Sequence, residues 1–135
     1  MANGDPRATL IAAVPQLFAS DITASLAFFT DKLGFAVAFV YGEPAFYAQV
    51  KRTGAQIAVR HVDRDVMDRI AAAMSAGVDM LAASISVDDV QALYSEFRAA
   101  NVAFHQQLRT EPWGARTFIV RDPDGNLLLF AGGAD

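Results

Sequence analysis

The chain has 135 residues, of which 53% are hydrophobic, enough for one compact core and too few for two ordinary domains. Its 11 basic and 15 acidic residues give a net charge of −4, which argues against nucleic acid as a partner and leaves a cationic ligand allowed. Cysteine is absent, so disulfides, thiolate metal sites and thiol nucleophiles are excluded, and His61 and His105 are the only histidines.

The N-terminal segment gives no targeting or membrane signal. Residues 1–7 are polar, and the apolar run at 8–14 is shorter than a membrane span and has no basic leader. We therefore expect a soluble, cytoplasmic protein with no membrane partner.

The first half of the chain predicts a strand, a helix and three further strands. Residues 9–18 are apolar and partly β-branched, which indicates a buried strand, and Pro15 places that strand near a sheet edge or a hinge because proline lacks an N–H donor. A helix is predicted from a cap at Asp21 to a left-handed stop at Gly34. The three strands are predicted at 35–41, 45–51 and 56–61.

The second half repeats this order after a linker at 62–79, which carries a short amphipathic helix closing at Gly77. A helix is predicted from Asp88 to Asn101. The distance from cap to stop is 101 − 88 = 13 positions here and 34 − 21 = 13 in the first half, which indicates an internal repeat. Strands are predicted at 81–87, 102–108, 117–121 and 126–130, the last two joined by a hairpin at 122–125.

The repeat predicts an α+β fold: one domain over 1–135, made of two βαβββ modules at about 8–61 and 80–131. Each curved sheet needs a partner, so two modules, within the chain or across a dimer, are expected to form a half-open barrel-like cup with the helices outside. Ligands are expected in the concave face of that cup.

Two runs of residues carry a resemblance to a known family. Ala13-Val14-Pro15-Gln16-Leu17 with the following residues to Leu33-Gly34-Phe35 is similar to the opening of bleomycin resistance proteins, and 111–116 with 121–126 resembles their closing motif. The chain thus resembles the vicinal oxygen chelate superfamily of glyoxalases, dioxygenases and bleomycin resistance proteins, although 42–80 matches poorly. The resemblance implies a planar small-molecule ligand, with a cationic group allowed, that is sequestered for antibiotic resistance in a cleft at a dimer interface. It also implies a homodimer that exchanges its N-terminal strand around Pro15.

The resemblance also bears on metal binding. Enzymes of the superfamily hold a divalent metal with His, Glu or Gln on four strands, and the matching positions here are Val14, Ala58 or Val59, Ala82 and Leu129. None of these side chains can ligate a metal. The resemblance therefore implies a binding protein without metal or cofactor rather than an enzyme. The alternative is a glyoxalase- or dioxygenase-type enzyme with a displaced site built from His61 or His105, with Glu43 or Glu111 as nominal carboxylates.

The resemblance places Phe39 and Trp113 at ligand-stacking positions, with Phe46 as a looser candidate. Ser84 and Ser86 stand where drug-binding members carry two tryptophans, which implies a wider and more polar cleft.

Other interpretations of these residues stay open from the sequence. Trp113 and Phe39 also fit plain packing roles. Arg60 would face the cleft if Ala58 does, and His61 if Val59 does, because facing alternates along a strand. A third interpretation keeps the fold as a dimerisation module that binds no ligand.

Overall fold

The structure is a computed structural model that describes residues 7–74, 77 and 79–133. The first half contains β1 (Gln16–Ala19), α1 (Ile22–Ala27), the π-helical turn η1 (Phe28–Lys32), β2 (Ala36–Tyr41), β3 (Tyr47–Arg52) and β4 (Ala55–His61). The connecting helix is α2 (Arg64–Met74). The second half contains β5 (Leu81–Ser86), α3 (Val90–Ala99), β6 (Phe104–Thr110), β7 (Arg116–Arg121) and β8 (Leu127–Gly132).

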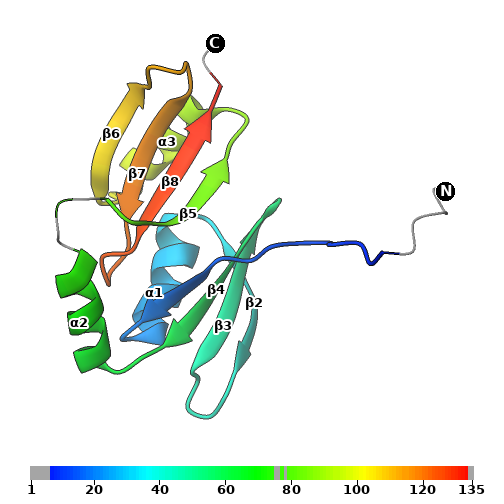
Figure 1. Cartoon of the computed structure of the whole chain (residues 1–135), viewed down its shortest axis with the longest axis vertical. Helices are drawn as coiled ribbons and strands as arrows, with labels where there is room; N and C mark the ends of the chain where they lie inside the picture. Colours follow the sequence, from blue (N-terminus) through cyan, green and yellow to red (C-terminus); the bar gives the residue numbers. More distant parts are fainter. Residues whose placement is uncertain (1–6, 75–76, 78, 134–135) are drawn as a thin grey trace.

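The two halves have the same sheet topology. Sheet A has the strand order β1-β4-β3-β2 and sheet B the order β5-β8-β7-β6, and in each the first strand lies parallel to its neighbour while the other pairs are antiparallel. The predicted α+β class with two βαβββ units is confirmed. Figure 1 shows the two sheets one above the other, with α1 and α3 behind them. We call the side of each sheet turned away from α1 and α3 its open face.

The residues at which the helices begin and end match the sequence patterns closely. Asp21 caps α1 by accepting a hydrogen bond from the Ala24 N–H at 3.1 Å. Gly34 and Asn101 have φ angles of +73° and +59°, so both predicted left-handed stops are confirmed. The cap of α3 is Asp89 and not Asp88, because the Asp89 carboxylate accepts the Ala92 N–H at 3.0 Å.

The first helix is not a regular α-helix throughout its predicted span. It ends as an α-helix at Ala27 and continues as η1, in which the Leu33 N–H donates to the Phe28 carbonyl oxygen at 3.3 Å across five residues. The spacing of the apolar residues predicts which side of this segment is buried, and one wider turn does not change which residues lie on that side. Both Phe29 and Leu33 are fully buried.

The predicted strand at 9–18 is wrong over most of its length, because β1 begins only at Gln16. The preceding residues 7–15, here called the N-terminal arm, lead away from the body of the molecule (Figure 1). Leu10 and Ile11 in the arm are 95% and 92% exposed. An apolar composition favours burial, but the described part of this single chain does not cover the arm.

One hydrophobic core joins the two halves. In the second half the rings of Phe118 and Phe130 stack with centroids 5.3 Å apart, and the Phe97 ring on α3 meets both edge-on. Phe29 and Leu33 from the first half belong to the same cluster of buried side chains. The helices therefore pack against the inner faces of the two sheets in one shared core, and the open faces lie on the side away from α1 and α3.

Polar contacts also connect the halves. The Ser20 hydroxyl donates to the Asp124 carboxylate at 2.6 Å, and the Asn126 amide donates to the Phe18 carbonyl oxygen at 3.0 Å. These contacts fix the end of β1 against the β7–β8 hairpin. None of the helices in the described ranges is long and apolar enough to cross a membrane.

Candidate functional site

The open face of sheet A carries the side chains that alternate, along each strand, with the side chains packed into the core. Val50, Ile57 and Val59 pack into the core, so their neighbours along β3 and β4 point to the open face. Ala58 therefore faces outward and Val59 inward, which decides between the two positions that the sequence left open. Arg60 follows Ala58 onto the open face, where it lies opposite Tyr47 in the β3–β4 register.

Four aromatic residues, here called the aromatic patch, lie at one end of sheet A: Phe39, Tyr41 and Tyr47 on the open face, and Phe46, which precedes β3, against the Tyr41 ring. The rings of Phe39 and Tyr47 have centroids 5.9 Å apart, and those of Tyr41 and Phe46 are 5.5 Å apart. Phe39 is 46% exposed and Phe46 41% exposed. Both phenylalanines were predicted from the sequence, whereas the two tyrosines were not, although the alternation of Phe39 and Tyr41 along β2 indicates that these two share a face.

Ser84 and Ser86 lie on the open face of sheet B. In the β5–β8 register Ser84 is opposite Leu129 and Ser86 opposite Ala131, and Leu129 alternates with the core residues Leu128 and Phe130. Both serines line a cavity of about 670 Å³ between the two halves. The cavity is also lined by Pro15, by residues 52–57 of the β3–β4 hairpin and by 84–88, so it lies where the N-terminal arm leaves β1. It reaches into the junction of the two halves, where the core side chains Phe35, Leu93, Phe97 and Phe130 line it.

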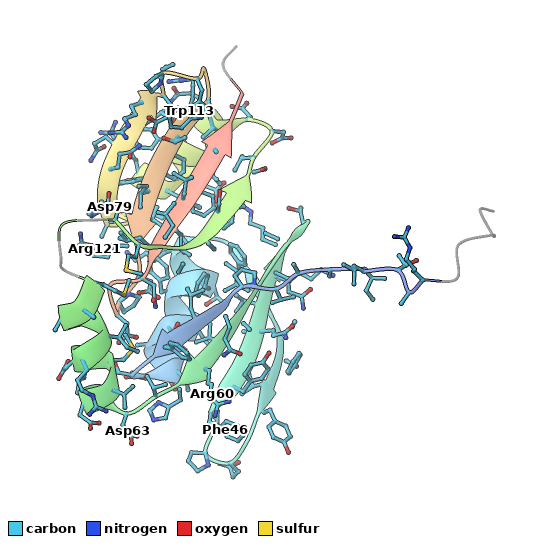
Figure 2. The ribbon with its side chains drawn as sticks, in the orientation of Figure 1. Phe46, Arg60, Asp63, Asp79, Trp113 and Arg121 are labelled. Carbon is cyan, nitrogen blue, oxygen red and sulfur yellow. The ribbon has the colours of Figure 1, made fainter. Side chains whose placement is uncertain are left out.

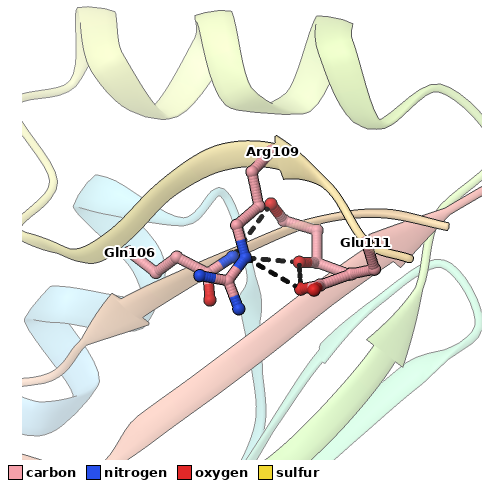
Figure 3. A network of polar contacts seen from close by, with 4 residues as sticks. Gln106, Arg109 and Glu111 are labelled. Carbon is pink, nitrogen blue, oxygen red and sulfur yellow. Dashed lines mark hydrogen bonds and ion pairs between the residues drawn. The ribbon is translucent and has the colours of Figure 1, made fainter. Parts of the chain in front are cut away.

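A buried carboxylate lies on the open face of sheet B, in a network that the sequence analysis did not identify (Figure 3). Glu111 accepts a hydrogen bond from the Thr117 hydroxyl at 2.7 Å and one from the Arg109 Nε–H at 3.1 Å. The Gln106 amide donates to the same hydroxyl oxygen at 2.9 Å. The hydrogen bond from Thr117, followed by that from Arg109, lowers the pKa of Glu111, so the carboxylate is ionised at neutral pH.

Trp113 lies in the turn that follows this network. The turn is closed by the Glu111 N–H bonded to the Ala115 carbonyl oxygen at 2.7 Å and by the Gly114 N–H bonded to the Glu111 carbonyl oxygen at 2.9 Å. The indole is 75% exposed, so it does not cover the edge of the core in this chain. Figure 2 shows Trp113 at one end of the molecule and Phe46 and Arg60 at the other, so a single chain does not bring them together.

The residues at the superfamily's metal positions do not fit a metal ion. Val14, Ala58, Ala82 and Leu129 offer no donor atoms. Across the described residues no group of three His, Asp or Glu side chains could hold a metal ion. The two histidines instead face one carboxylate each: the His61 Nε2 lies 3.6 Å from Asp63, and the His105 Nε2 lies 2.9 Å from Asp79.

The comparison with known proteins finds a matching family model. The family model of the Glyoxalase/Bleomycin resistance protein/Dioxygenase superfamily matches residues 10–130. No curated protein shows significant similarity to the sequence.

Solved structures share the fold over nearly the whole chain. A bleomycin-binding protein from Streptomyces verticillus, complexed with copper(II)-bleomycin, is 27% identical, with 94% of this chain and 99% of that chain covered and a TM-score of 0.71. A glyoxalase/bleomycin resistance protein/dioxygenase from Alicyclobacillus acidocaldarius is 24% identical, with 89% of each chain covered and a TM-score of 0.72. A bleomycin resistance determinant encoded on the transposon Tn5 is 18% identical, with 92% and 98% covered and a TM-score of 0.69.

Proposed function

Because the chain belongs to the Glyoxalase/Bleomycin resistance protein/Dioxygenase superfamily, we propose that it binds a planar small molecule, without metal or cofactor, in a cleft completed by a second copy of the chain. The bleomycin-binding and bleomycin-resistance neighbours support a ligand-binding or resistance-type role at the level of the family. Sequestration of a toxic compound is the activity that such a cleft performs without any chemical step.

The observation that carries the proposal is the simultaneous exposure of the aromatic patch and of Trp113 at opposite ends of one chain. Flat rings held in water gain free energy by stacking on a planar ligand. In a twofold-symmetric dimer the two contacts are equivalent. If the patch of one protomer faces a given region of its partner, the partner's patch faces that same region of the first protomer. A ligand between the patch of one protomer and Trp113 of the other would satisfy both surfaces.

The lack of donors at the four metal positions supports binding over turnover. Val14, Ala58, Ala82 and Leu129 would give the floor of the cleft an apolar surface, to which Ser84 and Ser86 add two hydroxyls. Such a floor suits an aromatic ring system with a few hydrogen-bonding substituents.

The charges of the cleft restrict the ligand further. Glu111 is matched by Arg109, whereas Arg60 is exposed on the open face of sheet A. An anionic substituent would therefore be recognised at short range by Arg60, while the net charge of −4 attracts cations only at long range.

The assembly is part of the proposal. The pairing of β1 with β4 starts at Gln16 opposite Ala58, so among the described residues Ala55, Gln56 and Ile57 have no strand on that side. The N-terminal arm of a second protomer would supply that strand and cover Leu10 and Ile11. Pro15, which precedes β1 and has no N–H to contribute, is the hinge of this exchange.

Titration of the single tryptophan tests the proposal. Three probes are suitable: proflavine as a planar cation, 2-anthracenecarboxylate as a planar anion, and metal-free bleomycin. We expect at least one of them to bind saturably by calorimetry and to change the emission of Trp113. The Trp113→Leu variant should bind that probe about tenfold more weakly, because one aromatic stacking contact is lost.

A matched control is Phe104→Leu, which removes a ring from the helix side of sheet B. Its affinity for the probe should equal that of the wild type. Probes that bind while Trp113 emission stays unchanged contradict the stacking role. A stable dimer that binds none of the three probes favours the dimerisation module instead.

A further inference from the structure

A second cavity, of about 400 Å³, lies between α2 and sheet B and shares no lining residue with the first. One wall is apolar and comes from α2 and the residue before β5: Met67, Ile70, Met74 and Met80. Three of the four methionines in the chain thus line this one cavity. Methionine side chains are flexible and polarisable, so they adapt to apolar groups of different shape.

The opposite wall carries a chain of polar contacts. The Arg121 guanidinium donates through Nη2 to the His105 Nδ1 at 2.7 Å. His105 must then carry its proton on Nε2, which donates to the Asp79 carboxylate at 2.9 Å. Figure 2 shows Asp79 and Arg121 close together beside sheet B, each bonded to His105. Asp79 and His105 therefore hold the guanidinium in a fixed position at the cavity wall.

In the part of the chain that the structure describes, the Arg121 guanidinium has no direct ion-pair partner. Asp79 is bonded to the imidazole, and Asp124, which also lines the cavity, accepts the hydroxyl and the backbone N–H of Ser20. An arginine fork with free donors beside an apolar wall is suited to a carboxylate, which it can bind with two parallel hydrogen bonds.

We propose that this cavity binds a monocarboxylate with an unbranched apolar tail, its carboxylate on Arg121 and its tail among Met67, Met74 and Met80. The volume falls in the range of small-molecule sites, and the walls divide into one charged and one apolar surface as an amphipathic ligand requires. The site is separate from the open-face cleft and does not depend on the ligand bound there.

Methionine methyl groups give a direct readout. Protein labelled with ¹³C at the methionine methyls has a signal for each of Met67, Met74 and Met80, and octanoate is the probe. We expect octanoate to shift these three signals saturably and to leave Trp113 emission unchanged. Octylamine, which has a tail of the same length and a positive charge, should leave the three signals in place.

Two variants test the assignment of the carboxylate. Arg121→Gln should weaken octanoate binding about tenfold or more, since a charge-assisted bidentate contact is lost, whereas Arg121→Lys should retain part of the affinity. Arg69→Gln, on α2 and outside the cavity lining, is the matched control and should bind octanoate as the wild type does. The proposal is overturned if octanoate shifts none of the three signals, if octylamine shifts them equally, or if Arg121→Gln binds octanoate with unchanged affinity.

Discussion

Arg52 and Glu96 form a bidentate ion pair between the two halves of the molecule. The Arg52 Nη1 and Nη2 atoms donate to the two Glu96 carboxylate oxygens at 2.8 and 2.9 Å, and Nη1 also donates to the Leu33 carbonyl oxygen at 2.8 Å. One guanidinium at the end of β3 thereby contacts α3 and the residue after η1. The hydrogen bond that Arg52 donates to Glu96 raises the pKa of Arg52, so the guanidinium stays charged.

Replacing Arg52 should therefore destabilise the protein moderately. Both side chains are partly exposed, at 32% and 46%, so water screens much of the attraction, and we expect Arg52→Ala to lower the free energy of unfolding by about 1 kcal/mol. Urea denaturation measures this. Arg69→Ala, whose ion pair with Asp65 on α2 is long and exposed, is the control and should change stability little. Equal losses of unfolding free energy in the two variants would contradict a stabilising role for the ion pair between Arg52 and Glu96.

The buried carboxylate of Asp122 predicts a pH dependence of stability. It accepts the backbone N–H groups of Asp124 and Asn126 at 2.9 and 2.8 Å, yet burial raises its pKa from 3.8 to about 6. Because the folded protein holds this proton more tightly than the unfolded chain, the stabilisation is complete below about pH 4 and is lost as the pH rises through 6. The shift of about two units corresponds to about 3 kcal/mol.

Urea denaturation of the wild type and of Asp122→Asn between pH 4 and 8 measures this contribution. The asparagine does not titrate, so the stability of the wild type relative to the variant should fall by about 3 kcal/mol across the range. The exposed Asp31→Asn variant is the control and should follow the wild type at each pH. Parallel curves for the wild type and Asp122→Asn would show that Asp122 does not titrate in this range.

Removing the N-terminal arm should weaken self-association. Deletion of residues 1–13 removes Leu10 and Ile11, which are almost fully exposed in one chain. If a second protomer covers them, sedimentation should show a dimer for the full chain and a larger dissociation constant for the truncated chain. Leu10→Ser with Ile11→Ser should have the same direction of effect. A full-length chain that stays monomeric at all concentrations would contradict both the dimer and the exchanged arm.

Metal removal should leave ligand binding unchanged. The apolar side chains at the four metal positions predict that the purified protein contains no stoichiometric metal. Elemental analysis before and after treatment with a chelator, with calorimetric titration of the same probe, checks this. Stoichiometric zinc, nickel, manganese or iron that disappears together with an activity would instead support the displaced enzyme site at His61 or His105.

Local patterns in the sequence predicted most of the fold. The caps at Asp21 and near Asp88, the left-handed stops at Gly34 and Asn101, and the period of two along the strands all depend on residues close in sequence. The predicted cap-to-stop spacing of 13 positions in both halves indicated the repeat. With Asp89 as the cap the second spacing is 101 − 89 = 12, and the identical strand order of the two sheets is what confirms the repeat.

The candidate site could be predicted only in part. Phe39, Phe46, Ser84 and Ser86 were named from a resemblance, and the register places Phe39 and both serines on the open faces. The network around Glu111 was missed because it brings β6, β7 and their turn together. A bulge between Phe104 and Gln106 puts Gln106 opposite Ile119, on the same face as Thr117, whereas strict alternation from Phe104 would have turned it to the core side.

The sequence by itself determined most of the secondary structure, the repeat and the apolar character of the metal positions, because each of these depends on residue type and on short-range spacing. Only the tertiary structure decided that Ala58 and not Val59 faces outward, that the N-terminal arm leaves the body, and that Arg121, His105 and Asp79 meet beside three methionines. Those outcomes depend on which surfaces are left after the core has packed. A local pattern does not contain that information, since burial is a property of contacts between distant parts of the chain.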